Sequence, residues 1–178
     1  MEKSLVRIFL GSLSDRKIAN IILCILKEIG IPYRVSIGSC HWHSDAGLEK
    51  LVKNAEENVM VAIGGMQFNL PSIVETINKV NWETHKLVLA IPTDKIAKHA
   101  NEDFPFGTVV FMAGFNSIDP EAGYKNSALG IAKLLAFRYP DYFVMKLDDY
   151  YKNLAKKKEL QKEVVLVDGL IPEPEKKL

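Results

Sequence analysis

The sequence is poor in three features, and each scarcity removes a class of protein. No segment approaches the ~20 apolar residues needed to span a membrane. The apolar run at residues 5–10 is interrupted by Arg7 and is too short for a signal peptide. The net charge is only +1, which gives no electrostatic basis for binding nucleic acid or an anionic membrane. The two cysteines, Cys24 and Cys40, lack Cys-x-x-Cys spacing, so we expect a reducing, cytoplasmic setting.

Two kinds of ligand motif are also missing. The sequence contains neither the Gly-x-Gly-x-x-Gly loop of dinucleotide-binding proteins nor the glycine- and lysine-containing loop that holds ATP phosphates. His41, His43 and Asp45 are close enough in sequence to chelate a metal ion, but no further group of metal ligands accompanies them. We therefore expect neither a cofactor nor a metal site.

The sequence does have enough apolar residues for a core. Hydrophobic residues make up 48% of its 178 residues, which is ample for one domain. We expect this domain to cover residues 1–163 and a tail to cover residues 164–178. The lysines at positions 156–158 are expected on a solvated face of a long C-terminal helix.

Short apolar runs alternate with amphipathic segments along most of the chain, as is typical of β-α-β units. The expected strands are residues 5–10, 33–37, 59–63, 86–91 and 108–112. The expected helices are residues 15–29, 45–57, 70–78, 121–137 and 142–162. This alternation predicts an α/β fold whose parallel sheet is covered on both faces. Cys24 lies among apolar residues of the first helix and is expected in the core.

Small polar residues follow the first two expected strands. Gly11-Ser12-Leu13-Ser14-Asp15 ends the first strand, where Gly11 permits a tight turn and Ser14 or Asp15 can cap the next helix. The N–H groups at that helix start suit an anion, whereas Asp15 can accept hydrogen bonds from ribose hydroxyls. Ser39-Cys40-His41 ends the second strand. His41 is the candidate general acid and base, because an imidazole titrates near neutral pH.

Three further segments add candidate ligand contacts. Gly64-Gly65 follows the third strand and allows close backbone approach, while Asn69-Leu70-Pro71 begins a helix with proline where it is tolerated. Residues 92–106 lack clear periodicity and have the length of an active-site loop. Lys125 lies in a helix start rich in small residues and can meet a phosphate.

Taken in order along the chain, these segments resemble those of the PurE family of purine biosynthesis. The loop Gly11-Ser12-Leu13-Ser14-Asp15 is similar to the family's Gly-Ser-x-Ser-Asp, and Ser39-Cys40-His41 is similar to its Ser-Ala-His. The helix start Lys125-Asn126-Ser127-Ala128-Leu129 is similar to Lys-Asn-Ala-Ala-Leu. Gly64-Gly65 with Leu70-Pro71, and Phe104-Pro105-Phe106-Gly107, complete the set, which spans roughly residues 5–150.

The resemblance implies a flavodoxin-like three-layer αβα sandwich with a central parallel sheet and a long C-terminal helix, assembled as a homo-octamer with sites between subunits. The implied substrate is a phosphoribosyl aminoimidazole, and the implied product is 4-carboxy-5-aminoimidazole ribonucleotide, formed without metal, ATP or biotin. His41 would move the proton. The residues implied to bind substrate are Gly11, Ser12, Ser14, Asp15, Ser39, Gly64, Gly65, Asn69, Leu70 and Lys125.

Two positions depart from the family pattern. Trp42 stands where the family has Arg or Lys, and Asn69 stands where one branch has His. The sequence leaves open whether the carboxyl donor is N5-carboxyaminoimidazole ribonucleotide, as in a mutase, or free CO2, as in a carboxylase. It also leaves open a related enzyme acting on another phosphoribosyl heterocycle, and a non-catalytic nucleotide-binding or assembly protein.

Overall fold

A computed structural model of the chain describes residues 4–39, 45–65, 68–81, 85–94, 97, 108–110 and 121–159. Five strands lie in one sheet. They are Val6–Leu10 (β1), Tyr33–Ile37 (β2), Val59–Gly64 (β3), Leu87–Pro92 (β4) and Val109–Val110 (β5). All neighbouring strands are parallel, in the order β2-β1-β3-β4-β5. The sheet is therefore the parallel one that the alternating sequence predicts.

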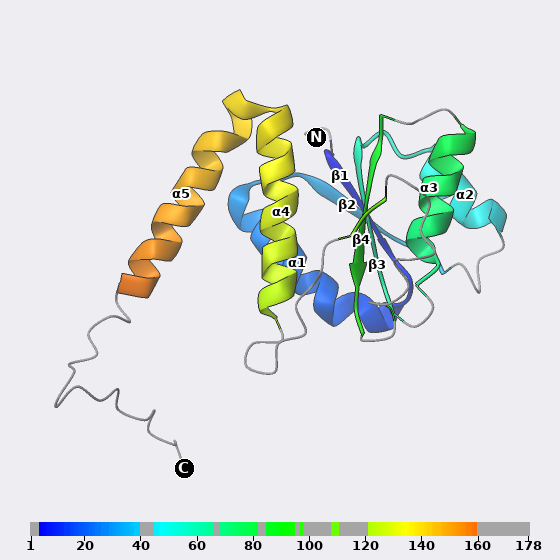
Figure 1. The fold of residues 1–178 in the computed structure, drawn as a ribbon, viewed down its shortest axis with the longest axis horizontal. Helices are drawn as coiled ribbons and strands as arrows, with labels where there is room; N and C mark the ends of the chain where they lie inside the picture. Colours follow the sequence, from blue (N-terminus) through cyan, green and yellow to red (C-terminus); the bar gives the residue numbers. More distant parts are fainter. Residues whose placement is uncertain are drawn as a thin grey trace, which may run out of the picture.

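Helices cover both faces of this sheet. A short 3-10 helix at Leu13–Asp15 (η1) leads into the first helix. The helices are Arg16–Ile29 (α1), Asp45–Lys53 (α2), Leu70–Val80 (α3), Ala122–Arg138 (α4) and Pro140–Glu159 (α5). In Figure 1, α1, α4 and α5 lie on one side of the sheet and α2 and α3 on the other. This arrangement confirms the predicted αβα sandwich with a long C-terminal helix.

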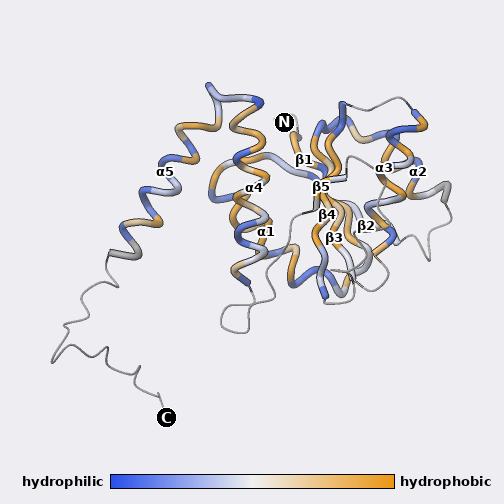
Figure 2. Tube along the Cα trace, in the orientation of Figure 1, coloured by the Kyte–Doolittle hydropathy of each residue, from blue (hydrophilic) through white to orange (hydrophobic). Residues whose placement is uncertain are grey.

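The inner strands β3 and β4 consist largely of apolar residues, as Figure 2 shows. These residues are buried along almost the whole length of both strands. A parallel strand with helices on both faces has no solvated side, so it reads as a continuous hydrophobic run. Successive residues of β3 and β4 point to opposite faces of the sheet and belong to two core clusters. Val61 and Leu89 pack on the side of α1 and α4, whereas Met60 and Val88 pack on the side of α2 and α3.

The first helix follows its sequence pattern at its end but not at Cys24. Gly30 ends α1 in the left-handed conformation, with φ of 77°, as a glycine at this position allows. The prediction that Cys24 is a core residue is wrong, because its side chain is exposed. The buried side of α1 runs through Ile22, Ile25 and Ile29 at helical spacing, and Cys24 falls on the other side.

Some element ends differ from the predicted ones. The second helix was expected to reach residue 57 but ends at Lys53, where the N–H groups of Asn54 and Ala55 close the last turn on the carbonyls of Lys50 and Val52. The predicted ends of the fifth strand, at residue 112, and of the last helix, at residue 162, lie outside the described residues. None of the helices in the described ranges is long and apolar enough to cross a membrane.

Candidate functional site

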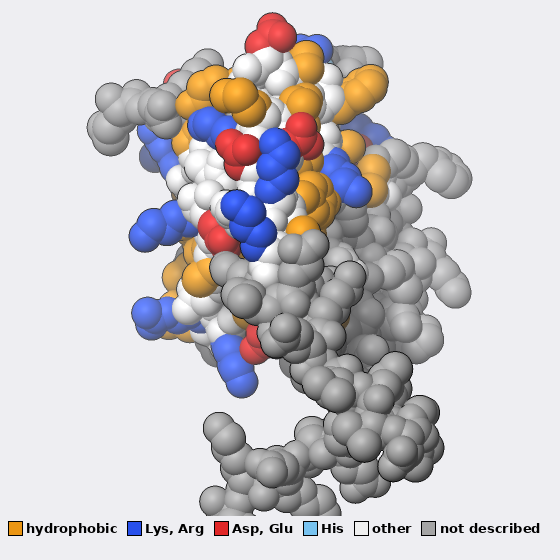
Figure 3. Space-filling view, turned by 90° about the vertical axis from the view of Figure 1, so that its left-hand side faces the viewer, with side chains coloured by type: hydrophobic (Ala, Val, Ile, Leu, Met, Phe, Trp, Pro, Cys, Tyr) orange, Lys and Arg blue, Asp and Glu red, His pale blue; other side chains and the backbone are white. Residues whose placement is uncertain are grey.

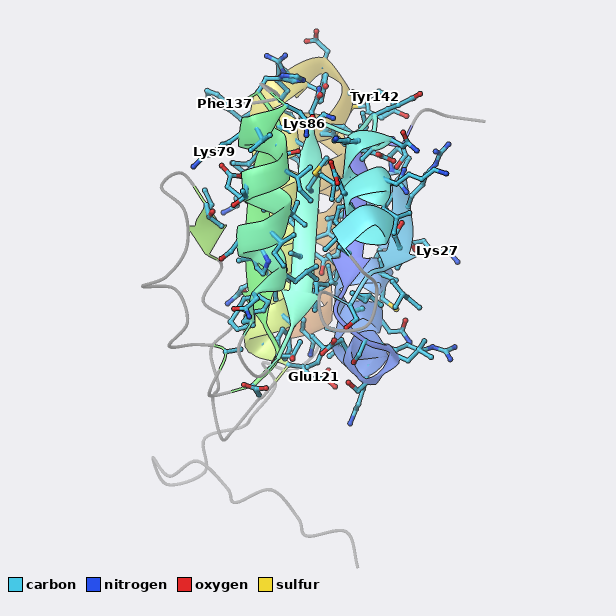
Figure 4. All side chains as sticks on the ribbon, turned by 90° about the vertical axis from the view of Figure 1, so that its right-hand side faces the viewer. Lys27, Lys79, Lys86, Glu121, Phe137 and Tyr142 are labelled. Atoms are coloured by element: carbon cyan, nitrogen blue, oxygen red, sulfur yellow. The ribbon has the colours of Figure 1, made fainter. Side chains whose placement is uncertain are left out.

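The candidate site lies at one edge of the sheet, where three neighbouring strands end. Because β1, β3 and β4 are parallel and adjacent, their carboxyl ends meet at the lower edge in Figure 1. The segments after them are joined by backbone hydrogen bonds. The N–H of Gly11 donates to Ile63 O at 2.9 Å, and the N–H of Thr93 donates to Gly64 O at 2.8 Å. Figure 4 shows Glu121, just before α4, at this edge, with Lys86, just before β4, at the opposite one.

The Gly11–Asp15 loop is a closed turn held by its own side chains. Ser12 is the N-cap of η1, and its hydroxyl accepts the N–H of Ser14 at 3.2 Å. Asp15 returns the contact by accepting the N–H of Ser12 at 2.9 Å, which completes a capping box. Asp15, one of the two residues expected to cap the first helix, is the N-cap of α1, but its side chain makes no capping hydrogen bond there. Ser12 caps the short turn that precedes it.

The Asp15 carboxylate is buried and hydrogen-bonded through both oxygens. Only 7% of the residue is exposed. Its Oδ2 accepts the Ser12 N–H and also lies 3.3 Å from the Ser12 hydroxyl, while its Oδ1 accepts the Thr93 hydroxyl at 3.0 Å. A carboxylate buried in this way stays in one orientation, because each oxygen has a donor that fixes it.

The glycines of the site differ in how much room they have for a side chain. Among the described residues, Gly30 is the one glycine with positive φ. A side chain at Gly11 would place a Cβ 3.4 Å from Asp15 Oδ2 and 3.7 Å from the Cα of Gly64. A Cβ at Gly65 would overlap the Asp94 carboxylate and lie 2.8 Å from Thr93 Oγ1. Gly65 is therefore the position at which the close approach of the strand ends excludes a side chain.

Helix α4 adds a buried phenol to the strand ends. Tyr124 is 6% exposed, and its hydroxyl donates to the carbonyl of Thr93 at 3.3 Å. Burial raises the pKa of Tyr124 above its usual value, and the Asp94 and Asp15 carboxylates raise it further. Tyr124 is thus held in its protonated, hydrogen-donating form. Asp94 in turn accepts the backbone N–H of Ala97 at 2.7 Å through Oδ1.

Thr93 and Asp94 lie in residues 92–106, the segment expected to be an active-site loop, but neither they nor Tyr124 were singled out from the sequence. A signal for the first two was present, because a polar pair directly follows a buried strand of a parallel sheet. The carboxyl ends of such strands gather at one edge. No sequence signal marked Tyr124, whose role depends on α4 packing beside the end of β4.

The structure brings together six of the predicted site residues: Gly11, Ser12, Ser14, Asp15, Gly64 and Gly65. Leu70 is buried at the start of α3 and packs in the core cluster, and Asn69 precedes it without making a capping hydrogen bond. Lys125 forms an ion pair with Glu121 at 3.3 Å. Burial raises the pKa of Tyr150 in α5, and the charge of Lys125 partly offsets that rise. Ser39 follows β2 and is partly buried. The candidate acid and base His41, and Trp42 beside it, lie outside the described residues.

The strand order and the position of the polar residues define a class of protein. A parallel sheet in the order β2-β1-β3-β4-β5 is flavodoxin-like, and such folds bind ligands at the carboxyl ends of their strands. Within the described ranges, no three His, Cys, Asp or Glu side chains are grouped to hold a metal ion. The site is thus an edge of hydroxyls, backbone amides and carboxylates, suited to a polar organic ligand.

The chain belongs to the AIR carboxylase family, whose model matches residues 5–157. It is 31% identical over 155 residues to an N5-carboxyaminoimidazole ribonucleotide mutase of Methanocaldococcus jannaschii, covering 86% of this chain and 92% of that one. A mutase of the same name from Pyrococcus horikoshii is 29% identical, with 89% and 86% covered. A crystal structure of Treponema denticola PurE shares the fold, with a TM-score of 0.67 and 22% identity over 92% of this chain and 99% of that one.

Proposed function

We propose that this protein makes 4-carboxy-5-aminoimidazole ribonucleotide in purine biosynthesis, by moving the carboxyl group of N5-carboxyaminoimidazole ribonucleotide from nitrogen to the ring carbon. The observation that carries the proposal is the 31% identity to a mutase along 86% of the chain. The hydrogen-bonded Gly11–Asp15 loop, at the strand ends where such a ligand would bind, supports it. The reaction is an isomerisation and requires no net input of protons or electrons.

In this proposal, His41 carries the one proton that the reaction moves. As the protonated imidazole, it gives a proton to the carbamate nitrogen while the N–C bond breaks and CO2 is released beside the ring. The ring carbon then attacks CO2, and the proton that it loses returns to His41. A single imidazole can act first as acid and then as base when its pKa lies near the working pH.

The remaining predicted residues hold the ribonucleotide during these steps. Ser12, Ser14 and Ser39 bind its phosphate or ribose, and Asp15 accepts a ribose hydroxyl. Gly64 and Gly65 line the space for the migrating carboxylate, beside Asn69 and Leu70, and Lys125 contributes a positive charge toward the phosphate. The hydroxyls of Ser12 and Ser14 support this assignment, because they are hydrogen-bonded to each other in this turn and can donate to a phosphate or ribose oxygen.

We further propose a cytoplasmic homo-octamer with sites between subunits, and a division into a domain of residues 1–163 and a tail of residues 164–178. Large apolar side chains at the surface of α4 and α5 support self-association. Phe137 is 91% exposed and Met145 is 72% exposed. Exposed apolar side chains that gather on one face mark a protein contact site.

A carboxyl-transfer assay tests the enzymatic proposal. The protein is incubated with N5-carboxyaminoimidazole ribonucleotide in one arm, and with aminoimidazole ribonucleotide plus bicarbonate in the other, both without ATP. We expect product in the first arm. Product in the second arm alone would replace the mutase with a CO2-dependent carboxylase, and product in neither would contradict the proposed function.

A matched pair of histidine variants tests the role of His41. We expect His41→Asn to lower kcat by at least about a hundredfold, the usual contribution of a positioned acid or base. The ribonucleotide should still bind, as isothermal titration would measure. His85→Asn is the control, because His85 is exposed before β4, at the end of the sheet opposite the site. Equal loss of activity in both variants would argue against His41.

A further inference from the structure

Thr93 reaches Asp15 from a distant part of the chain. Its hydroxyl donates to Asp15 Oδ1 at 3.0 Å, across 78 residues of sequence. The two Asp15 oxygens are thus engaged unequally. Oδ2 has two donors nearby, the N–H and the hydroxyl of Ser12, whereas Oδ1 has the Thr93 hydroxyl. An ionised carboxylate offers about two acceptor positions on each oxygen. Among the residues that the structure describes, these contacts leave an acceptor position for a ligand on Oδ1, directly beside Thr93.

The position of Thr93 is fixed from three sides. Its N–H donates to the carbonyl of Gly64 at 2.8 Å, and its carbonyl accepts the hydroxyl of Tyr124 at 3.3 Å. On the third side its hydroxyl lies against Gly65, where even a Cβ would come within 2.8 Å. These contacts fix the position of the Thr93 hydroxyl, and the hydrogen bond from that hydroxyl fixes the Asp15 oxygen that accepts it.

We propose that Thr93 is the positioning residue of Asp15, and that Tyr124 supports it. By donating to Oδ1, Thr93 orients the carboxylate so that the second acceptor position on that oxygen points at a ribose hydroxyl of the substrate. Thr93 acts through Asp15 and has no part in the proton transfer. This inference rests on the proposed function, because the hydroxyl that Asp15 accepts belongs to the proposed ribonucleotide.

The test compares two ligands across isosteric variants. Isothermal titration measures the Kd of aminoimidazole ribonucleotide and of its 2′,3′-dideoxy analogue for each protein. Thr93→Val keeps the side-chain shape and removes the hydroxyl. We expect it to weaken ribonucleotide binding about tenfold, as the loss of a hydrogen bond to a charged group does, and to leave the dideoxy analogue within about twofold, since that ligand has no hydroxyl for Asp15 to accept.

Two further variants separate positioning from a structural role. Thr93→Ser restores the hydroxyl and should return ribonucleotide binding to within about twofold to threefold of the wild type. Tyr124→Phe removes the hydroxyl that donates to the Thr93 carbonyl. It should change the ratio of the two Kd values in the same direction as Thr93→Val, but by less. This variant also tests the inference if Thr93→Val does not fold. In an Asp15→Asn background, Thr93→Val should have little additional effect, because the residue through which it acts is already altered.

The outcomes distinguish this inference from the function on which it rests. If Thr93→Val weakens both ligands equally, or neither, while the wild type binds the ribonucleotide, Thr93 does not position Asp15 and the inference alone is overturned. If the wild type binds neither ligand, the proposed function is contradicted, and so is the inference that rests on it. Retained carboxyl transfer with an unchanged ratio of Kd values would leave the enzyme intact and reject the role of Thr93.

Discussion

Single residues at the strand ends matter most through the space they leave. Gly65 is the position with the least room, because the Asp94 carboxylate and the Thr93 hydroxyl lie where its side chain would be. Asp15 is the clearest case. Its two oxygens accept hydrogen bonds from the loop that contains it and from Thr93 after β4. Because Gly65 has no side chain, Thr93 can lie beside it and donate its hydrogen bond to Asp15.

Gly65 gives a direct test of this close packing. In Gly65→Ala, the new methyl group would overlap the Asp94 carboxylate and press on Thr93 Oγ1. We expect the free energy of unfolding to fall by about 1–3 kcal/mol, as for overpacked sites. Gly64→Ala is the matched control, because its Cβ would only touch the Phe68 ring at 3.4 Å and should cost less. Urea unfolding measures both, and equal losses would contradict the packing argument.

Ionisation of Tyr124 is expected to lower the free energy of unfolding at alkaline pH. Its pKa is raised in the folded state, so the unfolded chain loses this proton first as the pH rises. The stabilisation is complete below about pH 10 and is lost as the pH rises through the folded pKa. We expect the free energy of unfolding to fall less steeply above pH 10 in Tyr124→Phe than in the wild type. Tyrosinate absorbance and urea unfolding measure the effect. Identical slopes would show that Tyr124 does not carry it.

At the scale of elements, β1, β2 and the segment before β3 are joined by a buried ion pair. Arg7 Nε lies 3.1 Å from Glu57 Oε2, with side chains 12% and 1% exposed, and Arg7 Nη1 donates to Ser36 Oγ at 3.1 Å. The other Glu57 oxygen has no hydrogen-bond partner within the part of the chain that the structure describes. Arg7 is therefore the group that compensates the buried carboxylate.

Removing Arg7 should cost far more than removing an exposed partner. We expect Arg7→Met to lower the free energy of unfolding by about 3 kcal/mol, because it leaves a buried charge unpaired. The double variant Arg7→Met with Glu57→Leu should recover most of that loss. Lys53→Met is the control, since the exposed pair of Lys53 and Glu49 is worth well under about 1 kcal/mol. Equal losses in the single variants would contradict this account, as would a double variant no better than Arg7→Met.

The sequence predicts the elements better than their contacts. Strand β2 was expected at the residues where it lies, because Tyr33, Val35 and Ile37 alternate with polar residues there. The end of α2 was missed, since residues 54–57 contain neither the glycine nor the proline that would mark it. Ala55, just beyond the helix, is buried, and its carbonyl accepts Lys86 Nζ at 2.8 Å. In the candidate site, the Gly11–Asp15 loop was predicted from its residue types. Thr93 and Tyr124 were not, because their roles depend on which strands and helices lie beside one another.

At the scale of the whole molecule, the α4–α5 side presents large apolar residues among charged ones (Figure 3). Besides Phe137 and Met145, Leu134 is 38% exposed and Val144 is 45% exposed. Helix α5 packs on α4 and leaves these side chains in water. A face of this kind suits contact with another copy of the chain.

The mass in solution tests the proposed assembly. Eight copies of the 20.0 kDa chain would give roughly 160 kDa by sedimentation or light scattering. We expect Phe137→Asp to reduce this mass, because a charge would replace the most exposed aromatic side chain of that face. Val80→Asp is the control, since Val80 is 70% exposed at the end of α3, on the other side of the sheet. A monomeric wild type, or equal effects of the two variants, would contradict the assembly.

The hydrogen bond between Thr93 and Asp15 has a consequence for biosynthesis. The groups that meet at the strand ends come from residues 11–15, 64–65, 93–94 and 124, so they meet only after most of the chain has left the ribosome. Until Thr93 is made, 78 residues after Asp15, the carboxylate has only its donors in Ser12. Tyr124 follows later still, and with it the hydroxyl that donates to the Thr93 carbonyl. At roughly 5–20 residues per second, several seconds of translation separate Asp15 from the last of these residues.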